Sequence, residues 1–109
     1  MSATDVNVAH VVRHLYGLDV ASAELLSARD FKVRTIDGDM FLLKVAPTGT
    51  KRSELEREIR MLIYLRICLP ELNCGRIIHT KKWQKIGTLR NEQGKERLVR
   101  LFSFPCGRV

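Results

Sequence analysis

The sequence predicts an α+β domain in which hairpin-linked strands form an antiparallel sheet. Two hairpin signals and one helix signal support this fold class. The turn Asp37-Gly38 separates two apolar runs, and Asn91-Glu92-Gln93-Gly94 separates two more near the end of the chain. A capped amphipathic helix is expected between these two hairpins. At 109 residues the chain forms one domain at most.

The first half of the chain predicts one helix and three strands. Thr4 or Asp5 is placed to cap the helix, and Gly17 is placed to end it. Its apolar residues recur at helical spacing: Val8, Val11, Val12 and Leu15. Three strands should follow, at residues 20–26, 31–36 and 40–45. The turn at 37–38 makes the second and third of these strands antiparallel neighbours.

The second half predicts a longer helix and two more strands. Ser53 and Glu56 have the spacing of a capping box, so the helix should run from Ser53 to about Cys68. Its apolar stripe consists of Leu55, Ile59, Leu62 and Ile63, widened by Met61 and Leu65. A short extended piece is expected at 76–79. The final hairpin joins strands 86–90 and 96–104, which gives a sheet of about five strands.

Lys44 is a cation near the end of the apolar strand 40–45. A buried lysine is costly unless an anion pairs with it. On a helical wheel, Glu58 falls inside the apolar arc of the second helix. We therefore expect the Lys44 ammonium to pair with Glu58 and to be held where phosphate oxygens could bind it. The residues alone leave one alternative equally open, in which Lys44 extends to solvent at a strand end and Glu58 lies on the surface.

The composition points to an anionic partner in a reducing compartment. The formal net charge is +7, and the only compact basic patch is Lys81-Lys82-Trp83-Gln84-Lys85. A nucleic-acid partner is not the expected one, because the phenylalanines (Phe31, Phe41, Phe102 and Phe104) lie in apolar runs typical of a core. No apolar stretch is long enough for a membrane span and no secretory signal is visible. Three cysteines without paired spacing favour a cytoplasmic location.

Four stretches in order carry a resemblance to a known family. Tyr16-Gly17-Leu18 follows the leading helix, and Ser27–Val33 has the pattern of a segment Ser-x-x-Asp-x-Asn-Phe-x-Val. Phe41–Val45 matches a strand with a nucleotide-binding lysine, and Leu98–Arg108 matches a hinge Val-Arg-Leu-Leu-x-Tyr-Leu-Pro-Gly-Arg. Over most of residues 8–109 the chain is similar to the small, N-terminal lobe of the aminoglycoside phosphotransferase/choline kinase-like family. Within that family it most resembles the hydroxylysine kinase subgroup.

The resemblance implies a role for particular residues. Lys44 would bind nucleotide phosphates with Glu58 as its helix partner, and Ser27 and Asp30 would lie in the loop over the phosphates. The backbone at the hinge would hold the purine, through Phe104, Pro105 and Cys106. The hydroxylysine kinase subgroup often has glutamine at the Glu58 position, so Glu58 is nearer the wider family. The sequence departs from the family at two places. The phosphate loop is shorter and lacks the asparagine after Asp30, and Pro105-Cys106 stands where Leu-Pro is usual.

The resemblance also implies a function. Residues 1–109 would be the nucleotide-binding lobe of a small-molecule kinase that uses GTP or ATP with Mg²⁺ and transfers the terminal phosphate to a hydroxyl group. The substrate that the resemblance favours is 5-hydroxy-L-lysine. The amino-alcohol or amino-acid substrate, the catalytic base and the magnesium ligands belong to the family's large lobe. No catalytic residue is therefore expected in this chain, which should be inactive alone. Two alternatives remain, a degenerate lobe that serves as an interaction module and a basic nucleic-acid-binding domain.

Overall fold

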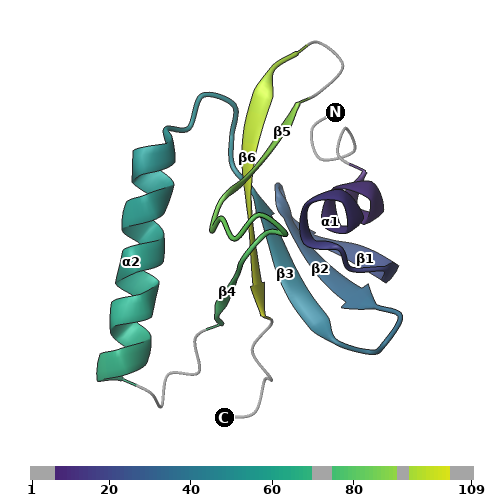
Figure 1. Cartoon of the computed structure of the whole chain (residues 1–109), viewed down its shortest axis with the longest axis horizontal. Helices are drawn as coiled ribbons and strands as arrows, with labels where there is room; N and C mark the ends of the chain where they lie inside the picture. The colour runs from purple at the N-terminus through teal and green to yellow at the C-terminus, as the bar shows by residue number, and fades with distance from the viewer. Residues whose placement is uncertain (1–6, 70–74, 91–93, 104–109) are drawn as a thin grey trace.

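The structure is a computed structural model that describes residues 7–69, 75–90 and 94–103 (Figure 1). Two helices and six strands occur in it. In chain order they are α1 (Val8–Tyr16), β1 (Val20–Ser27), β2 (Asp30–Thr35), β3 (Met40–Val45), α2 (Arg52–Cys68), β4 (Ile77–Ile78), β5 (Gly87–Arg90) and β6 (Glu96–Ser103).

The strands form one antiparallel sheet with the order β1-β2-β3-β6-β4, and β5 also pairs with β6. The predicted α+β fold and both predicted hairpins, β2–β3 and β5–β6, are confirmed. The described sheet has six strands rather than about five, because part of the extended piece at 76–79 pairs with β6. In that pairing Ile77 lies opposite Phe102 and Ile78 opposite Leu101.

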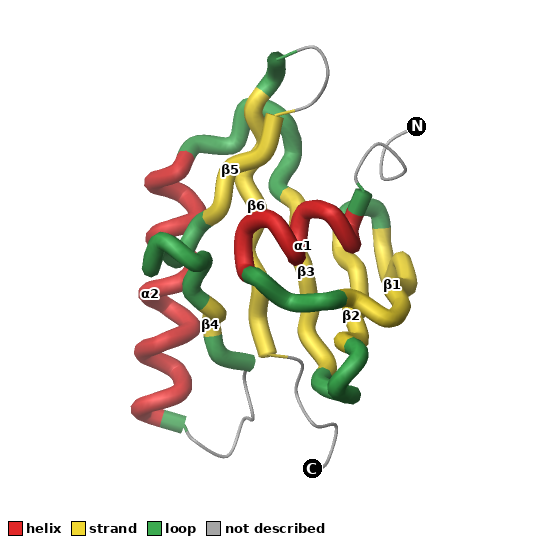
Figure 2. Tube along the Cα trace, turned by 45° about the vertical axis from the view of Figure 1, so that its right-hand side comes forward, coloured by secondary structure: helices red, strands yellow, loops and turns green. Residues whose placement is uncertain are grey.

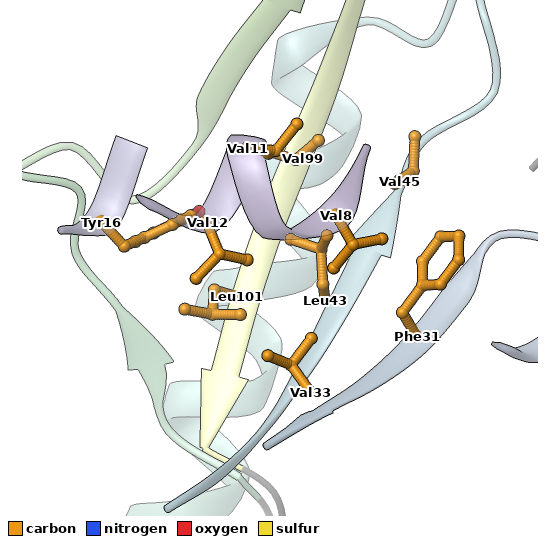
Figure 3. Close-up of a cluster of buried hydrophobic side chains, with 10 residues drawn as sticks. All are labelled: Val8, Val11, Val12, Tyr16, Phe31, Val33, Leu43, Val45, Val99 and Leu101. Carbon is orange, nitrogen blue, oxygen red and sulfur yellow. The ribbon is translucent and has the colours of Figure 1, made fainter. Parts of the chain in front are cut away.

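Helix α1 covers one face of the sheet (Figures 1 and 2). Leu43 and Leu101 are cross-strand neighbours, as are Val45 and Val99, so both pairs point to the same face. The apolar side of α1 closes over these residues (Figure 3). The main core cluster consists of Val8, Val11, Val12, Tyr16, Phe31, Val33, Leu43, Val45, Val99 and Leu101.

Helix α2 packs on the other face, beside β4 and β6 (Figure 2). Its cluster is smaller and consists of Ala46, Leu55, Ile59, Ile86 and Leu98, with Ile63 and Ile77 packed against it. Only Leu55 and Ile59 of the helix are buried. Met61, Tyr64 and Ile67 are mostly exposed, so the second half of α2 is held less tightly than the first.

The caps of the two helices differ from the sequence prediction. Thr4 and Asp5 lie outside the described residues, and the cap of α1 is Asn7, whose Oδ1 accepts from the His10 N–H at 3.1 Å. Gly17 ends α1 as predicted, in the left-handed conformation that glycine adopts at little cost.

The capping box predicted at Ser53 is wrong. Helix α2 begins at Arg52, Lys51 is its N-cap, and no side chain caps it there. The Lys51 carbonyl already accepts from the Glu54 N–H at 3.0 Å, so the first turn starts before Ser53.

Strand boundaries also shift by a residue: β1 ends at Ser27 rather than 26, and β5 begins at Gly87 rather than 86. Strand β2 spans Asp30–Thr35 rather than 31–36, and Ile36 is 66% exposed. Strand β6 reaches Ser103, and Phe104 lies outside the described residues. Of the three cysteines, Cys68 is described and has a free, exposed thiol. Neither described helix is long and apolar enough to cross a membrane.

Candidate functional site

Three charged residues lie side by side on three neighbouring strands. Asp30 of β2 is paired in register with Lys44 of β3, and Lys44 is paired with Arg100 of β6. Because adjacent residues of a strand point to opposite faces, this row lies on the face away from α1. Glu58 of α2 approaches the row from above that face and contacts Arg100.

Arg100 is the most deeply buried charge of the row. Its side chain is 6% exposed, and it forms an ion pair with Glu58, whose side chain is 45% exposed. Burial lowers the pKa of the Arg100 guanidinium, and the negative charge of Asp30 opposes that shift. The Arg100 Nε has no hydrogen-bond partner among the described residues. The ion pair connects the sheet to α2 through a group that has lost most of its contact with water.

Lys44 is more accessible than the apolar strand suggested. Its Nζ lies 4.0 Å from Oδ2 of Asp30, and the two side chains are 33% and 32% exposed. At this distance and exposure the ion pair contributes little to stability. The ammonium is thus fixed to a strand, faces the α2 side of the sheet, and can still be reached by a solvated anion.

The predicted pairing of Lys44 with Glu58 is wrong in this structure. Strand β6 lies between β3 and the part of the sheet beside α2, so its Arg100 is the first cation that Glu58 meets. The planar guanidinium also matches a carboxylate better than an ammonium does. Lys44 has Asp30 as its ionic partner instead.

The loop residues predicted to cover the phosphates come together with Lys44. Ser27 of β1 is paired with Asp30 of β2 across a short turn. The Arg29 carbonyl accepts from the Val45 N–H at 2.9 Å, which ties this turn to the end of β3. Ser27, Asp30 and Lys44 therefore lie at the same end of the sheet. The predicted hinge residues Phe104, Pro105 and Cys106 lie outside the described part of the chain.

Comparison with known proteins agrees with this arrangement at the level of the fold. No protein-family model matches the sequence, and no curated protein matches it either. Among solved structures, an amicoumacin kinase bound to AMP-PNP and Ca²⁺ superimposes with a TM-score of 0.75 at 14% identity. A spectinomycin phosphotransferase bound to ADP and spectinomycin superimposes with a TM-score of 0.64 at 13% identity.

The chain has the fold of a kinase small lobe. The matches cover 96% and 89% of this chain but 33% and 28% of the two solved structures. The small lobe described here therefore spans about a third of the length of the proteins that it matches. At these identities the likeness concerns the fold and does not distinguish the hydroxylysine kinase subgroup.

Arg100 is the residue of the small lobe whose role the sequence reasoning missed. It lies in the apolar run Leu98–Phe104, just as Lys44 lies in Met40–Val45. A cation in an apolar strand needs an anion, and Arg100, flanked by Val99 and Leu101, meets this condition as well as Lys44 does. The sequence therefore contains two candidate cations for Glu58, Lys44 and Arg100.

The described part of the small lobe contains no complete metal site. No group of three or more histidine, cysteine, aspartate or glutamate side chains gathers there. Asp30 is the carboxylate closest to Lys44. A single carboxylate can supply one ligand to a Mg²⁺ that keeps several waters and is also bound by phosphates.

Proposed function

We propose that this chain is the nucleotide-binding lobe of a small-molecule kinase and that Lys44 binds the phosphates of GTP or ATP. The observation that carries this proposal is the position of Lys44. It is a strand-held ammonium, one-third exposed, at the end of the sheet where the β1–β2 turn closes. The likeness to small lobes of a kinase and a phosphotransferase, solved with AMP-PNP and ADP, supports it.

The residues present fit a phosphate group. Lys44 supplies the positive charge, and the backbone around Ser27 and Asp30 lies beside it. The carboxylate of Asp30 would repel a bare phosphate. It would attract a Mg²⁺ bound to the nucleotide. In kinase chemistry the metal neutralises the charge of the transferred phosphoryl group. This chain's own residues would hold and orient the nucleotide.

We further propose that phosphoryl transfer requires groups beyond this small lobe. A base to accept the substrate proton and further magnesium ligands would come from a large lobe, as would the pocket for the acceptor. The acceptor class is a hydroxyl group on an amino-alcohol or amino acid, and 5-hydroxy-L-lysine is the best candidate. This choice rests on the sequence resemblance to the hydroxylysine kinase subgroup. A cytoplasmic location would supply both nucleotides.

Titration of the 109-residue chain with a fluorescent ATP analogue in the presence of Mg²⁺ tests the phosphate site. We expect saturable binding that unlabelled ATP or GTP displaces and that Lys44→Met weakens at least about tenfold, the loss typical of a charged contact. Lys51→Met is the matched control, because Lys51 is an exposed lysine at the start of α2, outside the row. Equal affinity of Lys44→Met and the native chain would refute the proposal.

A second experiment tests whether phosphoryl transfer requires groups beyond this lobe. The chain alone should consume neither GTP nor ATP when 5-hydroxy-L-lysine is added, although it binds the nucleotide. Turnover by the chain alone would show that the catalytic groups are already present. The substrate is tested in a protein that supplies a large lobe. Turnover there with another amino-alcohol but not with hydroxylysine would overturn the choice of hydroxylysine as the acceptor.

One observation favours a second function, that of a non-catalytic interaction module. Glu58 is engaged by Arg100, so Lys44 has no partner on α2 to hold it in place. A lobe of this kind would keep the fold but bind nucleotide weakly or not at all. The same titration separates the two functions, since a degenerate lobe would show no difference between the native chain and Lys44→Met.

A further inference from the structure

A separate cavity of about 240 Å³ lies between the second half of α2 and β4, outside the row that contains Lys44. Its apolar part includes Ile63 of α2 and Phe102 of β6. Four basic side chains line it as well: Arg66, Arg76, His79 and Lys85. Among the described residues, no acidic side chain belongs to this lining. The cavity is therefore an apolar depression surrounded by groups that attract an anion.

The four basic side chains are available to a partner. The ion pairs within residues 7–69, 75–90 and 94–103 join Arg13 to Asp19, Lys44 to Asp30, Arg90 to Glu96 and Arg100 to Glu58. None of the basic residues of the cavity takes part in them. Lys85 and Arg76 are exposed, and Arg66 and His79 are half-buried.

An exposed tryptophan stands next to this cavity. The ring of Trp83 lies 5.3 Å from the ring of His79, measured between centroids, and Trp83 is 80% exposed. Among the described residues it is the only non-glycine with a positive φ, at 61°. A backbone conformation of this kind costs about 1–3 kcal/mol and is found preferentially at functional sites.

The turn that carries Trp83 is held firmly. The buried side chain of Thr80 accepts hydrogen bonds from the Lys82 and Gln84 N–H groups at 3.2 and 3.1 Å. The Thr80 carbonyl accepts from the Trp83 N–H at 2.9 Å, and the Lys81 N–H donates to the Leu15 carbonyl at 2.8 Å. These bonds fix the backbone of the turn that carries Trp83, whose ring contacts His79 of the cavity lining. A turn that is already ordered loses little entropy when a ligand binds beside it.

The size of the cavity selects the kind of ligand. Sites for drug-sized molecules measure roughly 300–1,000 Å³. At about 240 Å³ the cavity suits a single large apolar side chain, which is how an anchor residue of a peptide binds. The basic side chains that line the cavity match acidic groups on either side of such an anchor.

We propose that this cavity binds a segment of another polypeptide in which one large apolar side chain is flanked by acidic residues. The apolar side chain enters between Ile63 and Phe102, and its carboxylate neighbours meet Arg66, Arg76 and Lys85. Single-stranded nucleic acid fits less well, because successive bases need several exposed aromatic rings and Trp83 stands alone at this site. An anionic membrane fits less well, because Ile63 and Phe102 of the cavity lining are half-buried and buried.

Trp83 supplies the measurement, because it is the single tryptophan of the chain. The probe is an acetylated and amidated hexapeptide with one phenylalanine among aspartates and glutamates. Adding it to the full 109-residue chain should shift the Trp83 emission to shorter wavelength and saturate. A peptide with alanine in place of the phenylalanine should bind at least about tenfold more weakly, as expected for an anchor residue.

Matched variants locate the site. Arg66→Gln and Lys85→Gln should each weaken peptide binding about threefold to tenfold, the range of a partly exposed charged contact. Arg60→Gln is the control on the same helix, since Arg60 does not line this cavity, and Lys51→Gln is the lysine control. Lys44→Met should leave peptide binding unchanged, which separates this inference from the nucleotide site.

Three results would overturn the proposal. The first is equal binding of the phenylalanine and alanine peptides, which would mean that charge alone acts. The second is equal weakening by Arg60→Gln and Arg66→Gln, which would remove the cavity from the explanation. The third is a Trp83 response to oligothymidylate or to phosphatidylserine vesicles that the peptide cannot displace, which would assign the surface to nucleic acid or to membrane. Anisotropy of a labelled peptide with Trp83→Phe confirms that the emission reports binding.

Discussion

Arg100 of β6 and Glu58 of α2 form an ion pair between groups of unequal burial. The Arg100 side chain is 6% exposed and the Glu58 side chain 45% exposed, and the two residues are 42 positions apart in the sequence. A carboxylate that is half in water can be hydrated if its partner is lost. A guanidinium enclosed by the sheet and α2 cannot be hydrated in this way. Arg100 therefore needs Glu58 more than Glu58 needs Arg100.

This asymmetry predicts that removing the carboxylate costs more than removing the guanidinium. Glu58→Gln should lower the free energy of unfolding by about 1–3 kcal/mol, because Arg100 would keep a buried charge with a poorer partner. Arg100→Met should change it by less than about 1 kcal/mol, since a side chain of similar length fills the same space without a charge. Urea denaturation of each variant measures both values.

The double variant completes the test. Glu58→Gln combined with Arg100→Met should be about as stable as Arg100→Met alone, because the penalty of the unpaired guanidinium has gone. Equal destabilisation by the two single variants, with simple addition in the double, would show that the ion pair does not act as a unit.

The fold could be predicted from the sequence because the patterns that indicate it, turns and hydrophobic periodicity, are local. The Asp37-Gly38 turn correctly predicted β2 and β3 as antiparallel neighbours. The position of β6 between β3 and the side of the sheet next to α2 depends on pairing between distant segments. A helical wheel does not contain that information. The sequence prediction therefore paired Glu58 with Lys44, whereas the structure pairs it with Arg100.

The start of α2 shows a second limit. Ser53 and Glu56 have the capping-box spacing, yet the helix already begins at Arg52. A turn upstream, in which the Thr50 N–H donates to the Pro47 carbonyl at 3.1 Å, directs the chain into the helix earlier. Turn geometry outweighed a side-chain preference that is worth only about 1 kcal/mol. The hydrogen bonds around Thr80 that position Trp83 likewise gave no sequence signal.

The contact between Asp30 and Lys44 predicts a gain of affinity. In the absence of Mg²⁺, Asp30→Asn should tighten the binding of an ATP analogue about twofold to fivefold, because a neutral amide no longer competes with phosphate for the ammonium. With Mg²⁺ present the gain should disappear or reverse, since the carboxylate can then face a cation. Titrations with and without Mg²⁺ measure both affinities.

Asp39→Asn is the matched control for Asp30→Asn. Asp39 lies at the β2–β3 turn, where it contacts Thr35 through its backbone. It should not change nucleotide affinity at either metal concentration. Tightening by both substitutions would point to the overall charge of the chain rather than to the phosphate site.

The burial of Tyr16 predicts a loss of stability at high pH. Burial in the α1 cluster raises the pKa of the Tyr16 hydroxyl above its ordinary value of 10.0, and the nearby charge of Arg100 opposes that shift. The unfolded chain therefore loses this proton at a lower pH than the folded chain does. The stabilisation is complete below pH 10 and is lost as the pH rises toward the pKa of the folded state, with a slope of up to about 1.4 kcal/mol per pH unit.

Unfolding free energies measured between pH 9 and 11 test this prediction. Tyr16→Phe should remove one such contribution to the pH dependence, whereas Tyr64→Phe should not, because Tyr64 is 65% exposed. The same slope in Tyr16→Phe and in the native chain would assign the alkaline loss of stability to other groups.

The uneven burial of the two helices predicts that α2 opens before the rest of the fold. Val11, Val12 and Tyr16 of α1 are buried, whereas Met61, Tyr64 and Ile67 of α2 are exposed. Local opening requires less free energy where few apolar contacts are lost. Amide hydrogens at 62–68 should therefore exchange about tenfold to a hundredfold faster than those at 12–16, after correction for intrinsic rates.

Hydrogen exchange read residue by residue measures this difference. Amides near Ile59 serve as the internal control, because Ile59 is 2% exposed and should tie the first half of α2 to the sheet. Protection should thus fall along the helix from Ile59 toward Cys68. Glu58→Gln should extend fast exchange toward Ile59, because the ion pair with Arg100 is the polar link that holds this part of α2 to β6. Uniform protection along α2, unchanged in Glu58→Gln, would mean that the helix and sheet unfold as one unit.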